Sequence, residues 1–171
     1  MEITMKLLII GHGRHGKDTV AEMLVERRPM LSFMSSSLFV AQTVVRGDLE
    51  DIGINYLTLE DCYEDRFNHR DFWRDSIARY CNPPERMAQG ILSDHDIYVG
   101  MRTRREFVAA RPLFDEVIWV DRSFYEPPEP SCELTEDDAT YYFNNNFGKR
   151  DLVYEMDDLQ EFLERKYPDD V

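Results

Sequence analysis

A ten-residue stretch near the start of the chain combines three glycines with two histidines, an arginine, a lysine and an aspartate: GHGRHGKDTV, residues 11–20. It follows the apolar run KLLII and matches the pattern G-x-x-x-x-G-K with Gly11, Gly16 and Lys17. Such a loop lets backbone N–H groups and a lysine surround phosphate oxygens, and it leads into a helix N-terminus, which favours anions. The stretch therefore predicts a phosphate-binding loop. The alternative is a glycine-rich turn between a strand and a helix that binds nothing.

The residues after the lysine depart from the usual form of this loop. The pattern normally continues with Ser or Thr, whose hydroxyl binds Mg²⁺, whereas here Asp18 comes first and Thr19 second. A carboxylate beside bound phosphates is repelled unless a metal or a proton intervenes. We expect these two residues to bind Mg²⁺, with Asp18 alternatively a base for an acceptor hydroxyl or only a carboxylate that favours the helix dipole. The full set predicted to contact the phosphates is Gly11, Gly13, Arg14, His15, Gly16, Lys17, Asp18 and Thr19.

Arginines follow two other apolar runs. Arg102 comes after DIYVGM and Arg122 after EVIWVD. If these runs and KLLII are strands of one parallel sheet, their carboxyl ends lie along one edge, where ligands bind. Arginines there can bind phosphate through two hydrogen bonds and offset the charge that develops during phosphoryl transfer. The predicted catalytic residues are Lys17, Asp18, Arg102 and Arg122. Three more arginines either extend this patch or form a solvated helix face: Arg104, Arg105 and Arg111.

The elements that would position these residues alternate along the chain, which predicts an α/β fold with a parallel sheet between two layers of helices. Strands are expected at residues 6–10, 30–35, 96–102, 116–123 and 140–146. Helices are expected at residues 18–28, 36–45, 58–81 with a break near Asn68, 83–92, 103–111 and 149–166. Residues 46–60 are expected to form a mobile connection, and the acidic, proline-rich residues at about 122–138 a lid-like loop. Residues 1–171 are expected to form one domain.

Composition narrows the class of protein. The chain has 171 residues, 43% of them hydrophobic, and a formal net charge of −14. This charge argues against nonspecific nucleic-acid binding over the whole surface, so a phosphorylated substrate needs a local basic patch. The three widely spaced cysteines are expected to be reduced thiols. With no membrane-length apolar run and no signal-peptide pattern, a cytoplasmic location is expected.

The motifs resemble those of phage-encoded deoxynucleoside monophosphate kinases over nearly the whole chain. The resemblance is carried by GKDT, LSFMSSSLFVAQTV, IYVGMR followed by Glu106, VIWVDRS and YYFNNN. Three segments are most similar to a branch from phages with modified thymine, whose members phosphorylate 5-hydroxymethyluridine in DNA: HRDFWRDSIARY, DIYVGMR and IWVDRS…SC. The resemblance implies a three-layer P-loop nucleotide-kinase fold whose central five-stranded parallel sheet is covered by helices on both faces.

The resemblance also implies roles for individual residues. Lys17 and its loop would bind the phosphates of ATP, the phosphoryl donor, together with Mg²⁺. Arg122 would act as a lid arginine, and Arg102 would lie on the acceptor side. A phage-encoded enzyme would work in the cytoplasm of the infected cell. The oligomeric state is left open.

One position departs from the family pattern. These kinases usually have Asp-x-Arg at the end of the acceptor-side strand, where this chain has Gly100 in GMR. The missing side chain makes room for a bulkier acceptor, such as a base flipped out of DNA. We therefore expect transfer to the 5-hydroxymethyl group of 5-hydroxymethyldeoxyuridine in DNA. The alternatives are a free deoxynucleoside monophosphate, which would give a diphosphate, and a nucleotide-binding regulatory module. Gly100→Asp should impair an enzyme that acts on DNA and be tolerated in one that acts on a mononucleotide.

The acceptor also decides whether a base is needed. A hydroxymethyl group loses a proton when it is phosphorylated, so a positioned carboxylate should help, whereas a monophosphate chiefly needs cationic groups. The candidate bases are Asp18, Asp71 and Asp75.

Overall fold

Five strands form a single parallel sheet in the computed structural model, which describes residues 5–168. The strands are β1 (Leu7–Ile10), β2 (Phe33–Ser35), β3 (Ile97–Val99), β4 (Glu116–Asp121) and β5 (Tyr141–Asn144). Their order across the sheet is β2-β3-β1-β4-β5, and every neighbouring pair is parallel. This arrangement confirms the predicted α/β fold, and it places β1 between β3 and β4. The segments that follow these three strands therefore meet at one edge of the sheet.

Alternation along the strands gives each face of the sheet its own apolar core. In β1, Leu7 and Ile9 join one core and Leu8 and Ile10 the other, since successive side chains point to opposite faces. Helices α1 (Lys17–Arg27) and α8 (Lys149–Lys166) contribute to the first core. Helices α6 (Arg86–Leu92) and α7 (Arg104–Ala110), which is followed by the 3₁₀ turn η3 (Arg111–Leu113), contribute to the second. The result is the expected three-layer arrangement.

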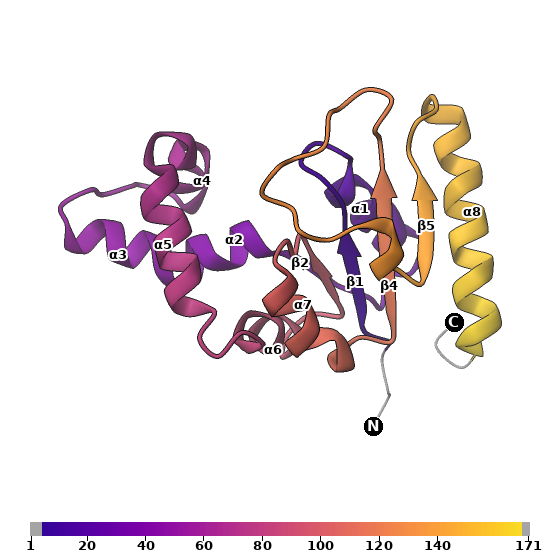
Figure 1. The fold of residues 1–171 in the computed structure, drawn as a ribbon, viewed down its shortest axis with the longest axis horizontal. Helices are drawn as coiled ribbons and strands as arrows, with labels where there is room; N and C mark the ends of the chain where they lie inside the picture. Colours follow the sequence, from indigo (N-terminus) through magenta and orange to yellow (C-terminus); the bar gives the residue numbers. More distant parts are fainter. Residues whose placement is uncertain (1–4, 169–171) are drawn as a thin grey trace.

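A helical arm extends from the sheet beyond β2 (Figure 1). It is formed by α2 (Ser36–Val40), the π-helical turn η1 (Ala41–Val45), α3 (Arg46–Asp51), α4 (Leu59–Glu64), the 3₁₀ turn η2 (Asp65–His69) and α5 (Arg70–Tyr80). The expected break near Asn68 is present as η2. The expected mobile connection at residues 46–60 is wrong for residues 46–51, which form α3. Val45 and Leu49 lie one helical turn apart and are both fully buried, so their packing holds this segment helical despite its glycine.

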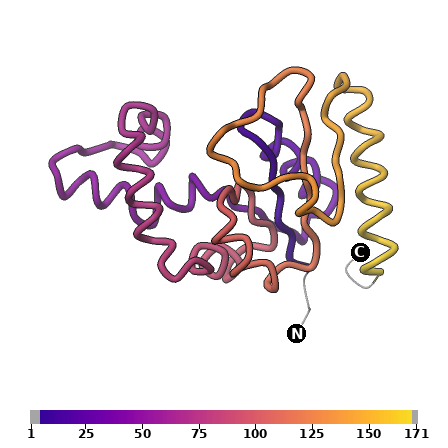
Figure 2. The backbone as a smooth tube through the Cα atoms, in the orientation of Figure 1, coloured from indigo at the N-terminus to yellow at the C-terminus, as the bar shows by residue number. Residues whose placement is uncertain are grey.

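The segment between β4 and β5 crosses the edge of the sheet and is called the lid segment here (residues 122–138). It rises from β4, passes over the loop after β1 and returns through the 3₁₀ turn η4 (Glu136–Asp138), and it is the orange tube in Figure 2. Its returning half is fixed to the end of β3 and to α7. The Glu133 N–H donates to the Arg102 carbonyl (2.8 Å), and the Arg104 N–H donates to the Glu133 carboxylate (2.7 Å). Arg104 also pairs with Asp138, so this arginine anchors the lid segment.

Among residues 5–168, no helix is both long enough and apolar enough to cross a membrane. All three cysteines are free, with Cys62 and Cys81 buried and Cys132 partly buried.

A buried carboxylate joins the start of β4 to the end of α8. Glu116 Oε1 accepts hydrogen bonds from Lys166 Nζ and from the Tyr167 hydroxyl, each at 2.8 Å. Burial alone would raise the pKa of Glu116, but the hydrogen bonds that it accepts, Lys166 foremost, outweigh burial and hold the pKa below its ordinary value of 4.5. The ionised carboxylate therefore stabilises the folded state.

We expect Glu116→Gln to lower the free energy of unfolding by about 1–3 kcal/mol at neutral pH, because hydrogen bonds to a buried charged group are lost. Since the folded-state pKa is depressed, the contribution is complete above about pH 4.5 and is lost as the pH falls through the folded-state value. Urea titrations between pH 7 and pH 3 measure this. Glu161→Gln, which removes an exposed carboxylate on the same helix, is the control. If wild type and Glu116→Gln differed in free energy of unfolding by as much at pH 3 as at pH 7, the stabilising role of the ionised Glu116 carboxylate would be contradicted.

Candidate phosphate-binding site

The loop between β1 and α1 is held in a shape that only glycine allows at two positions. Gly11 has φ 147° and Gly16 has φ 89°, both in the region that L side chains rarely adopt. A Cβ atom on Gly11 would lie 2.4 Å from the Val120 carbonyl oxygen, and one on Gly16 would lie 2.5 Å from Asn145 Nδ2. The loop is thus pressed against the ends of β4 and β5, which explains why the sequence has glycine at these positions.

Arg14 at the tip of the loop has a left-handed backbone with φ 63°, which is uncommon for a residue other than glycine. Strain of this kind persists where the surrounding structure imposes it, and it is concentrated at binding sites. Asn145 imposes part of the shape, since its buried side chain donates to the His15 carbonyl (2.9 Å). The exposed Arg14 lines a cavity of about 260 Å³ together with Gly13 and residues 126–129 of the lid segment.

The cationic side of the site is formed by the start of α1. Within residues 5–168, no side chain caps this helix N-terminus, whose N-cap residue is Gly16, so its N–H groups face the loop as an anion site. Lys17 bends back and donates from Nζ to the His12 carbonyl (2.7 Å). Burial, and next the nearby Arg102 guanidinium, lower the pKa of Lys17. The ammonium group is therefore poorly solvated and would gain from a bound anion.

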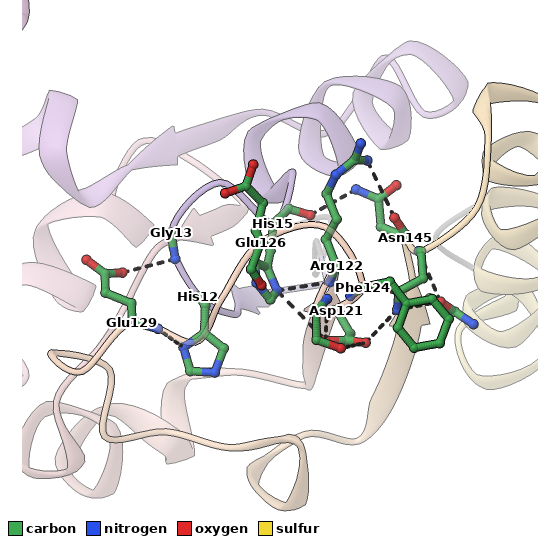
Figure 3. Close-up of polar contacts among 12 residues, drawn as sticks. His12, Gly13, His15, Asp121, Arg122, Phe124, Glu126, Glu129 and Asn145 are labelled. Carbon is green, nitrogen blue, oxygen red and sulfur yellow. Dashed lines mark hydrogen bonds and ion pairs between the residues drawn. The ribbon is translucent and has the colours of Figure 1, made fainter.

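An anionic group of the protein itself lies in this loop. The Gly13 N–H donates to Glu129 Oε2 (3.0 Å; Figure 3). Glu129 Oε1 pairs with Arg102. Burial by itself would raise the pKa of Glu129, but the Arg102 charge and the hydrogen bonds that the carboxylate accepts outweigh burial and lower it. Glu129 is therefore ionised at neutral pH, and a carboxylate from the lid segment occupies a position suited to a phosphate oxygen.

Both histidines of the loop bind the backbone of the lid segment. The ring of the fully buried His15 accepts the Arg122 N–H at Nδ1 (3.0 Å) and lies with Nε2 3.2 Å from the Glu126 carbonyl. His12 Nδ1 accepts the Glu129 N–H (3.1 Å), and burial followed by the nearby His15 lowers the pKa of His12. The bond to Arg122 requires a lone pair on His15 Nδ1, so the 3.8 Å approach of Asp121 to this atom is not a charged pair.

The two predicted catalytic arginines lie on opposite sides of the loop. Arg102 is beside Glu129 and close enough to Lys17 to lower its pKa. Figure 3 shows the Arg122 guanidinium turned away from Glu129 towards Asn145. Arg122 Nη1 lies 3.5 Å from the Asn145 carbonyl oxygen, and the guanidinium stacks on Tyr125 at 4.9 Å. The structure thus groups Lys17 with Arg102 and places Arg122 at the β5 side of the site.

The residues predicted to bind Mg²⁺ are accessible. Asp18 and Thr19 are exposed in the first turn of α1, next to Lys17. Within the described residues, no group of three or more His, Cys, Asp or Glu side chains could hold a metal ion. Mg²⁺ commonly takes one or two protein oxygens and completes its shell with water and substrate phosphates, and the Asp18 and Thr19 oxygens fit that donor set.

The other two candidate bases lie elsewhere. Asp71 and Asp75 are on α5 in the helical arm, where their side chains are 87% and 74% exposed and pair with Arg74. These contacts make them surface ion pairs of the arm, which leaves Asp18 as the candidate beside the loop.

Sequence reasoning missed Glu129, His12 and Asn145. The acidic composition of EPPEPSCE indicated a lid but gave no reason to single out one carboxylate. The three residues act through contacts with partners 116, 117 and 130 positions away in the sequence, so no local pattern could identify them.

Gly100 is not explained by space for a bulky acceptor. Its backbone has φ 103°, and a Cβ atom there would lie 3.0 Å from Ser36 Oγ. The backbone conformation itself requires glycine, so the expectation that Gly100→Asp would be tolerated in an enzyme that acts on a mononucleotide is wrong.

Comparisons with known proteins identify the fold. No family model matches the chain, and no curated protein matches it. A shikimate kinase from Bacteroides thetaiotaomicron is 12% identical with a TM-score of 0.50, covering 94% of this chain and 98% of that one. The protein TT1252 from Thermus thermophilus is 14% identical with a TM-score of 0.53, covering 95% and 97%. A gluconokinase from Sinorhizobium meliloti 1021 is 13% identical with a TM-score of 0.50, covering 98% of each chain. The chain thus has the fold of small P-loop kinases.

We expect Gly100→Asp to destabilise the protein by about 1–3 kcal/mol whatever the acceptor, because an L side chain is strained at this backbone conformation. Gly47→Ala should stabilise it by about 0.5–1 kcal/mol, since Gly47 lies in a helix with nothing within 4 Å of an added Cβ. Chemical denaturation of both variants measures the difference. Equal stability of Gly100→Asp and wild type would contradict the strain argument.

Proposed function

We propose that this protein is an ATP-dependent kinase that transfers the γ-phosphoryl group to a nucleotide-type acceptor. The observation that carries the proposal is the anion site itself. The Gly13 N–H binds a carboxylate, with Lys17 and Arg102 beside it and the N-terminus of α1 open towards it. A triphosphate offers the same kind of oxygen in greater number. The solved structures of a shikimate kinase and a gluconokinase with this fold support the same class of reaction.

The residues of the site match what phosphoryl transfer requires. An acceptor oxygen attacks the γ-phosphorus while the bond to the bridging β–γ oxygen breaks, so negative charge moves towards the leaving ADP. Lys17 and Arg102 would neutralise this charge as it moves, and the loop N–H groups would hold the phosphates in place. Mg²⁺, with Asp18 and Thr19 among its ligands, would supply further neutralisation of the phosphate oxygens. Asp18 is also the carboxylate available to receive the proton of a hydroxyl acceptor.

Arg122 would act at the other end of the nucleotide. Its guanidinium stacks on Tyr125 and faces the segment after β5, so it can pack against a planar base by the same kind of contact. This position suits ground-state binding of the donor better than neutralisation of the transferring group.

For the acceptor we propose the 5-hydroxymethyl group of 5-hydroxymethyldeoxyuridine in DNA. The sequence resemblance points to this acceptor, and the helical arm offers a surface suited to single-stranded nucleic acid. Phe67 is 58% exposed there, with the Arg66 guanidinium 4.3 Å and the Arg70 guanidinium 5.3 Å from its ring. An aromatic ring beside arginines stacks bases and attracts the backbone. With a net charge of −14, contact with DNA would be confined to such local sites.

The deciding experiment follows the label from γ-labelled ATP. The acceptors are each deoxynucleoside monophosphate, plain DNA, and DNA containing 5-hydroxymethyluracil. We expect label on the modified DNA alone. Label on a free monophosphate would instead identify a deoxynucleoside monophosphate kinase, and ATP turnover without any acceptor dependence would indicate a regulatory module.

We expect Lys17→Ala to lower the rate of phosphoryl transfer by at least about three orders of magnitude, since it removes a cation beside the transferring group. Its unfolding midpoint should stay close to that of the wild type, because Lys17 is not part of either core. Lys149→Ala, which removes an exposed lysine at the start of α8, is the matched control. Near-normal transfer by Lys17→Ala would exclude the proposed role of the loop.

We expect Arg70→Ala to raise the KM for modified DNA several-fold and to flatten its dependence on salt by about one phosphate contact. The KM for ATP should not change, because Arg70 lies on the arm. Steady-state rates at two or more salt concentrations measure this, with Arg165→Ala at the end of α8 as the control. A KM for DNA that is unaffected by Arg70→Ala would remove the arm from the acceptor site.

A further inference from the structure

The lid segment and the phosphate loop are joined by contacts that use the groups a nucleotide would need. The Gly13 N–H and the Arg102 guanidinium are both bound to Glu129. Gly13 provides a backbone hydrogen-bond donor and Arg102 provides a cation, and both lie at the edge of the anion site. A phosphate oxygen and the carboxylate cannot both occupy this position, because two anions in contact repel each other and would compete for the same donors.

Two side chains of the loop hold the lid segment, and the hydrogen bonds described for these side chains are to the backbone of that segment. His15 is within hydrogen-bond distance of the Arg122 N–H and the Glu126 carbonyl, and His12 accepts the Glu129 N–H. The Glu129 carboxylate is therefore delivered by a backbone that the loop itself orients. Glu129 is thus held twice by adjacent residues of the loop, through its backbone N–H by His12 and through its carboxylate by Gly13. A chance contact would not require both bonds.

The lid segment is held mainly by these polar contacts and very little by apolar packing. Of its residues 122–138, only Leu134 is buried. A cavity of about 370 Å³ lies beneath it, lined by His12, Trp119 and Asp121 among others. Segments with few buried apolar contacts open at low free-energy cost. Displacement of Glu129 would remove the charged contact of the first half and leave it held by hydrogen bonds to His12, His15 and Asn146, so it would open more readily. Glu133 and Asp138 would keep the second half attached to Arg102 and Arg104.

We propose that Glu129 is an internal phosphate mimic that closes the phosphate loop when no nucleotide is bound, and that the nucleotide triphosphate opens the lid segment by displacing it. The inference rests on the proposed function, because it takes the loop as the site of the triphosphate. The lid segment would therefore open when the nucleotide binds, whereas a conventional lid closes over its substrate. The carboxylate reduces the apparent affinity for the nucleotide by the fraction of molecules in which the loop is closed.

The first test is the binding of pyrophosphate and ATP to Glu129→Gln, measured by titration calorimetry. We expect both ligands to bind about tenfold more tightly than to wild type, because the competing charge is removed and the loop is left less occupied. Glu136→Gln removes the same charge from an exposed position of the same segment and should bind as wild type does. Glu129→Asp, which keeps the charge on a shorter side chain, should also bind more tightly, since its carboxylate no longer reaches Gly13.

The second test is limited proteolysis of the wild-type protein with chymotrypsin. Phe124 and Tyr125 are 78% and 60% exposed and lie in the half of the lid segment that would be released. We expect pyrophosphate to accelerate cleavage after these residues, whereas a lid that closes over its ligand would be protected. Glu129→Gln should be cleaved faster even without pyrophosphate.

The outcomes separate this inference from the proposed function. Tighter pyrophosphate binding by Glu129→Gln with no phosphoryl transfer in any assay would support the phosphate mimic and reject the kinase. Normal transfer with unchanged or weaker binding by Glu129→Gln would reject the mimic and keep the kinase. A loss of kcat in Glu129→Gln at unchanged affinity would also reject the mimic, because it would place Glu129 in the chemistry itself. Thermal unfolding of each variant verifies that it is folded.

Discussion

The hydrogen bond from the Gly13 N–H to the Glu129 carboxylate is the contact on which the arrangement of the site depends. A loop that directs N–H groups and a lysine to one point creates an unfavourable concentration of positive potential when nothing anionic is there. The structure meets this with a carboxylate brought from 116 residues further along the chain. The same carboxylate pairs with Arg102, and the two loop histidines hold the backbone of the lid segment on either side of it.

The parallel sheet explains why so distant a partner is at hand. Because β1 lies between β3 and β4, the segments after these strands carry the loop, Arg102 and the lid segment to one edge. β5 adds Asn145, whose side chain fixes the loop from the opposite side. Four of the five strands each lead into one group of the site, and these groups would not meet without the order of the strands.

The site and the helical arm impose different demands on the sequence. Around the loop, Gly11 and Gly16 are required by backbone conformation and because an added Cβ atom would lie 2.4–2.5 Å from neighbouring atoms. In the arm, buried residues hold helices together while arginines and aromatic rings remain exposed. These regions correspond to the two parts of the proposed function, with the loop as the site for phosphate and the arm as the site for a larger acceptor.

Local patterns in the sequence were sufficient for the strands, most of the helices and the glycine-rich turn between β1 and α1, because alternating apolar residues and the glycine spacing are short-range signals. They failed at α3, where burial of Val45 and Leu49 overrides a poor helical pattern, and at Gly100, whose role is conformational. They also could not select Glu129 among the many carboxylates of an acidic chain. The sequence by itself determined that a glycine-rich loop with the spacing of a P-loop stands at the end of a buried strand and that arginines follow two other strands. Only the tertiary structure decided that Arg102 is the arginine beside the loop and that Glu129 is the carboxylate bound to it. These contacts join residues more than a hundred positions apart or residues that follow separate strands, and the order of the strands brings them together.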